Sequence, residues 1–224
     1  REDMDEFALR SYEKAWKAIE QGKFKEEIVP VMVPQRKGDP KVFDTDEIPL
    51  RKPKTSAEAL ARLRPAFKKD GRVTAGNASK ISDGASAVVL MAREKAQALG
   101  CKPLVRVGAQ GSAGIDMKYV LVAPIYSIPK VLEKDGLKVE DVDLHEINEA
   151  FSSSSVAINR ELGLNPDKVN VHGGAVALGH PIGASGARVL TTLIYAMKEK
   201  GAEVGQATLC LGGGEAVTLV VYNE

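Results

Sequence analysis

The chain has 224 residues, 44% of them hydrophobic and 27% charged, which is enough to build one large domain, or a domain with an added lobe, around a buried core. Its 31 basic and 30 acidic side chains leave a formal net charge of +1, so no overall field recruits nucleic acid or an anionic membrane, and we expect neither as a partner. No apolar run reaches the roughly 20 residues of a transmembrane helix, and two cysteines with abundant lysine and glutamate and no secretory leader indicate a reducing compartment, for which we expect the cytoplasm.

The first predicted element is an amphipathic helix over residues 2–21. Its apolar side chains recur at helical spacing on one face: Phe7, Ala8, Tyr12, Ala15, Trp16 and Ile19. The chain starts at Arg1, without a methionine, directly before this helix. We therefore expect the sequence to be the remainder of a longer protein that was cut or split upstream.

The next part of the chain is dense in charge and proline. Residues 21–54 predict mostly loop, with one short strand over residues 28–33. A short helix is expected over residues 56–63. We expect residues 1–81 to form a lobe.

From residue 83 onward, apolar strands alternate with helices. Strands are expected over residues 86–91, 103–109, 142–147, 168–171, 206–211 and 216–222. Helices are expected over residues 93–99, 127–134, 150–162 and 185–200. The last two strands are joined by residues 212–215, a glycine-rich turn that predicts a hairpin. This order of elements indicates a layered α/β domain.

Three loops in the second half of the chain stand out, because functional residues gather at loops beyond strand ends in such sheets. Asn148 follows one strand, His180 lies in a glycine-bracketed bend before a helix, and Cys210 ends another strand. Glycines let the backbone approach a ligand closely, and the unpaired N–H groups at a helix start favour carbonyl oxygens and anions. We interpret the His180 bend as a place where a polarised substrate is held. Ser185 does not fit the Gly-x-Ser-x-Gly pattern of a hydrolase nucleophile.

These residues also have structural interpretations. Asn148 can cap the helix expected after it, and a cysteine at a strand end, such as Cys210, is often a small buried hydrophobic side chain. His145 and His172 are expected to be structural. A zinc site built from His172, His180 and Cys210 would lack the short paired spacing of metal motifs, so no metal is predicted.

Taken together, the three loops resemble the thiolase family, in which the same motifs occur in this order and near this spacing. They are Asn-Glu-Ala-Phe at residues 148–151, Gly-His-Pro at residues 179–181 and Cys-x-Gly-Gly-Gly at residues 210–214. The similarity extends to three further segments and so covers nearly the whole chain: residues 6–11, 63–67 and 74–79.

The resemblance implies a fold. It predicts a thiolase-like layered α/β/α architecture made of a C-terminal half-fold and a loop domain, with the N-terminal half largely absent. Residues 1–81 would be a CoA-binding loop domain, residues 82–100 the end of the N-terminal half-fold, and residues 101–224 the C-terminal thiolase domain.

The resemblance also implies catalytic roles, because thiolases join or cleave acyl-CoA units by Claisen chemistry. His180 would activate the nucleophilic cysteine as its base and would help to stabilise the enolate oxygen of acetyl-CoA. Asn148 would hold a water that donates the second hydrogen bond to that oxygen. Cys210 would move the α-proton of acetyl-CoA, and the backbone N–H of Gly212 would form half of a second oxyanion hole.

Further residues are expected, by the same resemblance, to bind CoA, which is a substrate here and not a cofactor. They are Arg51, Phe67, Ala75, Ser79, Ala150 and Phe151. No cofactor is expected. The expected partners are acetyl-CoA and other acyl-CoA molecules, and thiolases assemble as homodimers or tetramers.

One departure from the family pattern concerns the acyl-accepting cysteine, which thiolases carry in the first half of the polypeptide. Cys101 sits at a helix-to-strand junction and does not fit that role. We therefore expect an N-terminal thiolase segment or subunit to complete the enzyme. The first hypothesis is an acetoacetyl-CoA thiolase. The alternatives are a degradative 3-ketoacyl-CoA thiolase for longer chains and a non-catalytic CoA-binding or assembly subunit.

Overall fold

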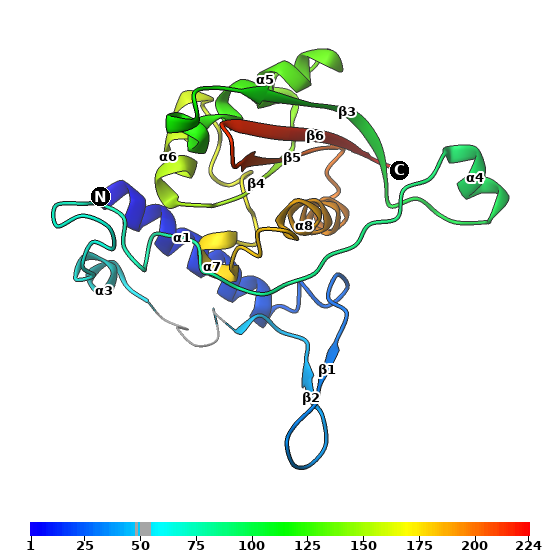
Figure 1. Ribbon diagram of the computed structural model, residues 1–224. Helices are drawn as coiled ribbons and strands as arrows, with labels where there is room; N and C mark the ends of the chain where they lie inside the picture. The colour runs from blue at the N-terminus through cyan, green and yellow to red at the C-terminus, as the bar shows by residue number, and fades with distance from the viewer. Residues whose placement is uncertain (48, 50–54) are drawn as a thin grey trace.

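A mixed four-stranded sheet lies at the centre of the computed structural model, which describes residues 1–47, 49 and 55–224 (Figure 1). The strand order is β3-β6-β5-β4. The bounds are β3 Val105–Gly114, β4 Leu144–Ile147, β5 Val204–Leu211 and β6 Glu215–Asn223. β6 pairs antiparallel with both β3 and β5, whereas β4 pairs parallel with β5. The β5–β6 hairpin confirms the prediction made from the glycine-rich turn.

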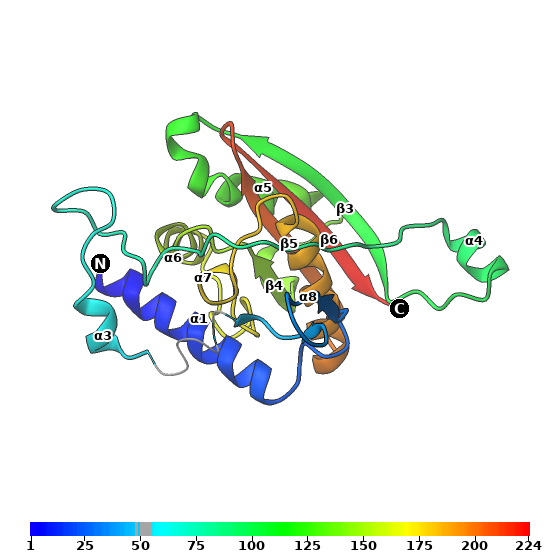
Figure 2. The same cartoon turned by 60° about the horizontal axis from the view of Figure 1, so that its bottom comes forward.

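Helices cover both faces of this sheet. Helix α5 (Pro124–Lys134) packs on one face, and helix α8 (Ser185–Lys200) packs on the other (Figures 1 and 2). The two neighbouring residues Val220 and Val221 of β6 are fully buried against opposite faces, the first in the α5 core and the second in the α8 core. Side chains alternate along a strand, so two apolar neighbours require cover on both sides. The predicted layered α/β/α architecture is therefore confirmed.

Helix α1 (Glu2–Glu20) builds a third core outside the sheet layers. Its buried Ala8, Tyr12 and Ala15 pack with Val176 of the short helix α7 (Ala175–Leu178) and with Leu60 of α3 (Ala57–Ala61). α1 also lies beside α6 (Ser152–Glu161). The predicted helix over residues 2–21 is confirmed, and it is joined to the C-terminal part of the chain through this core.

The remaining elements are short. They are β1 (Val31–Val33), β2 (Lys41–Phe43), α4 (Arg93–Ala98) and two 3₁₀ helices, Met117–Val122 and Val139–Asp141. Strands β1 and β2 form an exposed antiparallel hairpin that projects from the body (Figure 1). Only the first of these two strands was predicted. No helix in the described part of the chain has the length and apolar character needed to cross a bilayer.

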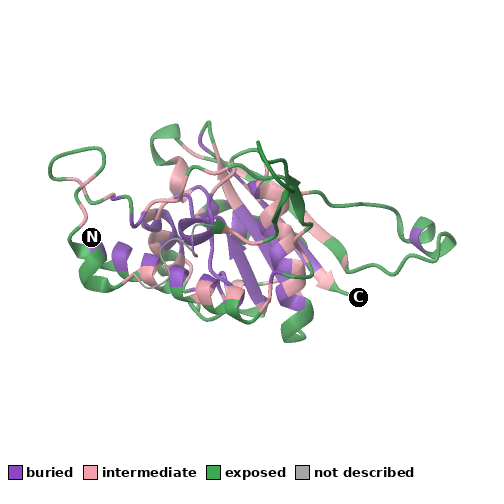
Figure 3. Cartoon of the chain, turned by 90° about the horizontal axis from the view of Figure 1, so that it is seen from below, coloured by how far each residue is buried: buried purple, intermediate pink, exposed green. Residues whose placement is uncertain are grey.

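Two predicted strands are wrong. Residues 86–91 are extended but are not assigned to any strand in the described chain, and Val89 and Leu90 are 85% and 72% exposed (Figure 3). An apolar run becomes a strand only when a neighbouring strand accepts its backbone hydrogen bonds. Residues 168–171 make a single bridge, between Val169 and His145. The segment then turns, because Asn170 adopts a left-handed φ of 45°.

Candidate active site

The parallel pair β4 and β5 places Asn148 and Cys210 at one edge of the sheet. Ile147 lies opposite Thr208 in the register, and the backbone N–H of Asn148 donates to the Thr208 carbonyl over 2.9 Å. Cys210 follows two residues later on β5, half-buried. Because the carboxyl ends of parallel strands meet at the same edge, two of the predicted loops come together here.

His180 reaches this edge from the turn between α7 and α8. Its Nε2 lies 3.3 Å from Nδ2 of Asn148, and its Nδ1 lies 2.6 Å from Oγ of Ser185. The Ser185 hydroxyl donates to the Pro181 carbonyl over 2.9 Å, so its oxygen accepts from the Nδ1–H of His180. This network assigns the tautomer and leaves the lone pair of Nε2 facing the Asn148 amide.

The electrostatic surroundings keep both ionisable groups of the site neutral. Burial, reinforced by the nearby Arg188 cation, lowers the pKa of His180 below its ordinary value of 6.5. Burial raises the pKa of the Cys210 thiol above its ordinary value of 9.0, against the opposing effect of a backbone hydrogen bond. A neutral imidazole and a protonated thiol at pH 7 suit a base and an acid, respectively.

Ser185 therefore controls the tautomer of His180, and Ser185→Ala is expected to weaken that control. Without the hydroxyl, the Nδ1–H loses its acceptor, and the population with the proton on Nε2 should rise. The ¹⁵N chemical shifts of the His180 ring report the two populations directly. Thr191→Ala is the matched control, because Thr191 lies on the same helix and its hydroxyl donates to the Ala187 carbonyl over 2.9 Å. Identical His180 shifts in both variants would contradict the assignment.

A second group of predicted residues is joined to His180 through the backbone. Ser79 donates from its N–H to the Ala150 carbonyl over 3.2 Å, and Ala78 forms an antiparallel bridge with Phe151. The backbone carbonyl of the next residue, Lys80, accepts a hydrogen bond from the backbone N–H of His180 over 2.9 Å. Three of the six residues expected to bind CoA therefore lie together, although Ser79 is 71 positions before Ala150 and 72 before Phe151 in the sequence. The backbone segment that pairs them continues directly to His180 through Lys80.

The other residues expected to bind CoA lie elsewhere. Phe67 is 76% exposed, and Ala75 is also exposed. Both lie next to a bridge between Pro65 and Thr74 and not in the paired segment. Arg51 lies outside the described residues. Their roles remain predictions.

The glycines of the β5–β6 turn differ in whether a larger side chain would fit in their place. Gly214 has a φ of 98°, and a Cβ there would lie 2.4 Å from the Ile115 carbonyl oxygen. Gly212 has no φ in the left-handed region, and a Cβ there would meet no atom within 4 Å. The fold therefore requires glycine at position 214, whereas at position 212 the space lies open.

The two other histidines have structural contacts. Nδ1 of the buried His145 lies 2.8 Å from the Gln206 side chain, and Nε2 of His172 lies 2.9 Å from the Glu199 carboxylate. Within the described residues, no three or more histidine, cysteine, aspartate or glutamate side chains form a group able to hold a metal ion. Two residues beside the site were not predicted from the sequence, namely Ser185 and the buried Glu149, which is 1% exposed.

This arrangement defines a layered α/β protein with an imidazole–amide pair beside a thiol at one sheet edge, and comparison with known proteins identifies its class. Residues 1–94 match the family described as "Thiolase, N-terminal domain", and residues 101–223 match "Thiolase, C-terminal domain". The chain belongs to the thiolase family.

Similar proteins carry more specific names. An acetyl-CoA acetyltransferase of Chromobacterium violaceum is 54% identical over 221 residues, and one of Pseudomonas aeruginosa is 53% identical over 224 residues. These matches cover 99% and 100% of this chain but 56% of each relative. The chain therefore spans little more than half the length of the curated relatives it matches.

Solved structures agree with these relatives. The crystal structure of the Bacillus anthracis acetyl-CoA acetyltransferase superposes with a TM-score of 0.97 at 48% identity, covering 100% of this chain and 56% of the other. Human mitochondrial 3-ketoacyl-CoA thiolase superposes with a TM-score of 0.91 at 33% identity, with 100% and 55% coverage.

Proposed function

We propose that this chain is the part of an acetyl-CoA C-acyltransferase that carries the acid–base residues of the reaction. The observation that carries the proposal is the contact of 3.3 Å between Nε2 of His180 and Nδ2 of Asn148, at the sheet edge where Cys210 lies in the last two residues of β5. A carbon acid needs a positioned proton-transfer group and a hydrogen-bond donor at its developing oxyanion, and this edge supplies both.

In the direction of thiolysis, the proposed sequence starts with neutral His180 taking the proton of a nucleophilic cysteine. The resulting thiolate attacks the C3 carbonyl of acetoacetyl-CoA, and the C2–C3 bond breaks. The electron pair of that bond forms the enolate of acetyl-CoA, which Cys210 protonates at C2. The proton on His180 then returns Cys210 to its thiol form, and the neutral imidazole takes the thiol proton of CoA. The CoA thiolate attacks the acetyl group, the bond between the acetyl carbon and the cysteine sulfur breaks, and His180 gives its proton to that sulfur. The N–H of Gly212 stabilises the tetrahedral oxyanion of this step.

The nucleophile itself is proposed to come from a preceding segment or a separate subunit. Neither cysteine of this chain is a candidate, since Cys101 is exposed three residues after the end of α4 and Cys210 has the proposed proton-transfer role. The buried Oδ1 of Asn148 has no hydrogen-bond partner in the described structure, so it is available to the water that the role of Asn148 requires. A non-catalytic subunit would need none of these side chains.

The proposed substrate is acetoacetyl-CoA, with acetyl-CoA as the product. The acetyl-CoA acetyltransferases of Chromobacterium violaceum and Bacillus anthracis are 54% and 48% identical to this chain. The solved structure of the Syntrophomonas wolfei acetyl-CoA acetyltransferase is 38% identical, whereas the 3-ketoacyl-CoA thiolase is 33% identical. A thiolase for longer acyl chains is the second candidate, and a series of 3-ketoacyl-CoA substrates of increasing length separates the two.

The test is reconstitution. The part of the Chromobacterium violaceum relative that this chain does not cover is fused ahead of Arg1, or added as a separate polypeptide, and this assembly is called the reconstituted enzyme. We expect CoA-dependent cleavage of acetoacetyl-CoA by the reconstituted enzyme and not by either part alone. Tight binding of the two parts without cleavage of any 3-ketoacyl-CoA would instead favour the non-catalytic subunit.

Replacing glycines of the β5–β6 turn separates catalysis from folding. Gly212→Ala is expected to leave the melting temperature nearly unchanged and to slow thiolysis, because the added methyl group enters the space proposed for the thioester. Gly214→Ala is expected to lower the free energy of unfolding by about 2 kcal/mol, from its positive φ and the close Ile115 carbonyl. Thermal unfolding and thiolysis rates check both, and full activity of Gly212→Ala would exclude the proposed oxyanion site.

A further inference from the structure

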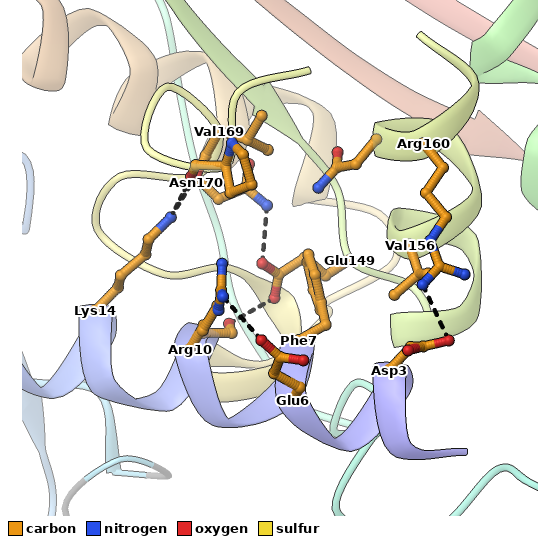
Figure 4. Close-up of a pocket in the computed structure, with 13 residues that line it drawn as sticks. Asp3, Glu6, Phe7, Arg10, Lys14, Glu149, Val156, Arg160, Val169 and Asn170 are labelled. Carbon is orange, nitrogen blue, oxygen red and sulfur yellow. Dashed lines mark hydrogen bonds and ion pairs between the residues drawn. The ribbon is translucent and has the colours of Figure 1, made fainter. Parts of the chain in front are cut away.

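Glu149 directly follows Asn148, and its carboxylate joins three separate parts of the chain. It is 1% exposed and lines a small pocket between α1 and α6 (Figure 4). Ser11 of α1 donates to Oε2 over 2.7 Å, the N–H of Val176 in α7 donates to Oε2 over 3.0 Å, and Asn170 donates to Oε1 over 2.8 Å. All three partners are donors, so the group at position 149 must accept at both oxygens.

The orientation of Asn170 is fixed independently of Glu149. Its Oδ1 accepts the backbone N–H of Ile147 over 2.8 Å, and its Nδ2 donates to the Ile147 carbonyl over 2.8 Å. The Asn170 side chain thus binds the end of β4 as a neighbouring strand would. Because Oδ1 is committed to Ile147, the amide cannot flip to offer an acceptor to residue 149.

The two glycines before α7, Gly173 and Gly174, leave room for α1 and the Glu149 carboxylate and do not face a ligand. A Cβ at Gly174 would lie 2.3 Å from Cδ of Glu149. A Cβ at Gly173 would lie 2.5 Å from the Ser11 carbonyl oxygen. Gly174 also donates its N–H to Oγ of Ser11 over 3.1 Å. Glycine at both positions lets α1, α7 and the Glu149 carboxylate meet.

We propose that Glu149 is a positioning residue whose carboxylate, held by Ser11, Asn170 and Val176, fixes the end of β4 so that the Asn148 amide stays against the His180 imidazole. The consequence for catalysis rests on the proposed function, whereas the consequence for the Asn148–His180 contact does not. A shift of about 1 Å in a reacting group can cost about 10²-fold in rate.

The test replaces the carboxylate by an amide of the same shape, Glu149→Gln. The new NH₂ group must face either Asn170 or the pair Ser11 and Val176, all of which are donors, so at least one contact is lost. Glu146→Gln is the matched control, because Glu146 is 2% exposed, lies within β4, and contacts Arg188 at 3.4 Å and none of the three donors. The first readout is NMR of this chain: the Asn148 side-chain NH₂ signals and the His180 ring nitrogens.

We expect both sets of signals to move in Glu149→Gln. In Glu146→Gln the Asn148 signals should stay in place, and these are the signals compared, because the partner of Glu146, Arg188, also acts on His180. In the reconstituted enzyme, Glu149→Gln should lower kcat by about 10- to 100-fold while KM for acetoacetyl-CoA changes less than about threefold. Wild-type signals in Glu149→Gln would overturn the proposal. An inactive wild-type reconstituted enzyme would count against the proposed function alone, since the NMR comparison still decides the role of Glu149.

A milder variant covers the case in which Glu149→Gln does not fold. Ser11→Ala removes one donor from α1, far along the chain from the catalytic residues, and leaves the carboxylate in place. The same signals should shift in the same direction by a smaller amount, with kcat reduced by about three- to tenfold. Unshifted Asn148 and His180 signals in a folded Ser11→Ala protein would then overturn the proposal.

Discussion

His180→Ala is expected to lower the rate of acetoacetyl-CoA thiolysis by the reconstituted enzyme by at least about 10³-fold, since loss of a general base costs about 10²–10⁴-fold and loss of an oxyanion donor costs 10²–10³-fold. One imidazole is proposed to serve both steps, so the two losses do not simply multiply. Steady-state kinetics with acetoacetyl-CoA and CoA measure the effect. A decrease of less than tenfold would exclude His180 from both roles.

His172→Gln is the control for this substitution. His172 lies in the same part of the chain, but its partners are the Glu199 carboxylate at 2.9 Å and the edge of the Phe24 ring. We expect this variant to lose some stability while its kcat stays within a few-fold of wild type. Thermal unfolding of both variants distinguishes loss of chemistry from loss of fold.

The pH profile gives a second readout of His180. The neutral imidazole is the proposed active form, and burial together with Arg188 lowers the pKa of this group below 6.5. The rate should therefore fall as the pH decreases through a midpoint below 6.5, because protonation removes the base. This acid limb should be absent from the residual rate of His180→Ala. An acid limb with its midpoint above pH 7 would point to a different group.

The fold was predictable where local signals agree with tertiary packing. Helix α8 has the predicted bounds because a regular apolar stripe faces β4 and β5, and Gly201 ends the helix in a left-handed conformation. The failure at residues 86–91 has the opposite cause. Their apolar pattern is typical of a strand, but a strand also needs a neighbour, and no periodicity within the segment reports whether one is present.

The candidate residues of the site could be named from the sequence, but their geometry could not. The motifs identified Asn148, His180 and Cys210, and the β4–β5 register then brought Asn148 and Cys210 to one edge. The glycines that bracket the His180 bend were interpreted as ligand-facing, whereas two glycines on its N-terminal side, Gly173 and Gly174, meet α1 and Glu149. Contacts between segments more than 100 residues apart leave no local pattern, which is why the Ser11–Glu149 hydrogen bond could not be foreseen.

Cys210→Ala is expected to separate the two halves of the reaction. Thiolysis requires protonation of the enolate carbon and should fall by about 10²–10⁴-fold without the thiol. Exchange of labelled CoA into acetyl-CoA breaks no carbon–carbon or carbon–hydrogen bond, and it needs the nucleophilic cysteine and His180 only. We therefore expect this exchange to persist within about tenfold of wild type in Cys210→Ala and to be lost in His180→Ala.

The thiol of Cys210 is suited to this role because burial raises its pKa, so it carries the proton that the enolate takes at neutral pH. Thiolysis should consequently fall as the pH rises through that raised pKa, since deprotonation removes the acid. Cys101→Ala is the matched control: that cysteine is exposed, and its removal should change neither reaction. Loss of CoA exchange in Cys210→Ala, at an unchanged melting temperature, would instead assign Cys210 to acyl transfer. That result would contradict the proposal that His180 alone activates the nucleophilic cysteine and that Cys210 acts only on the C2 proton.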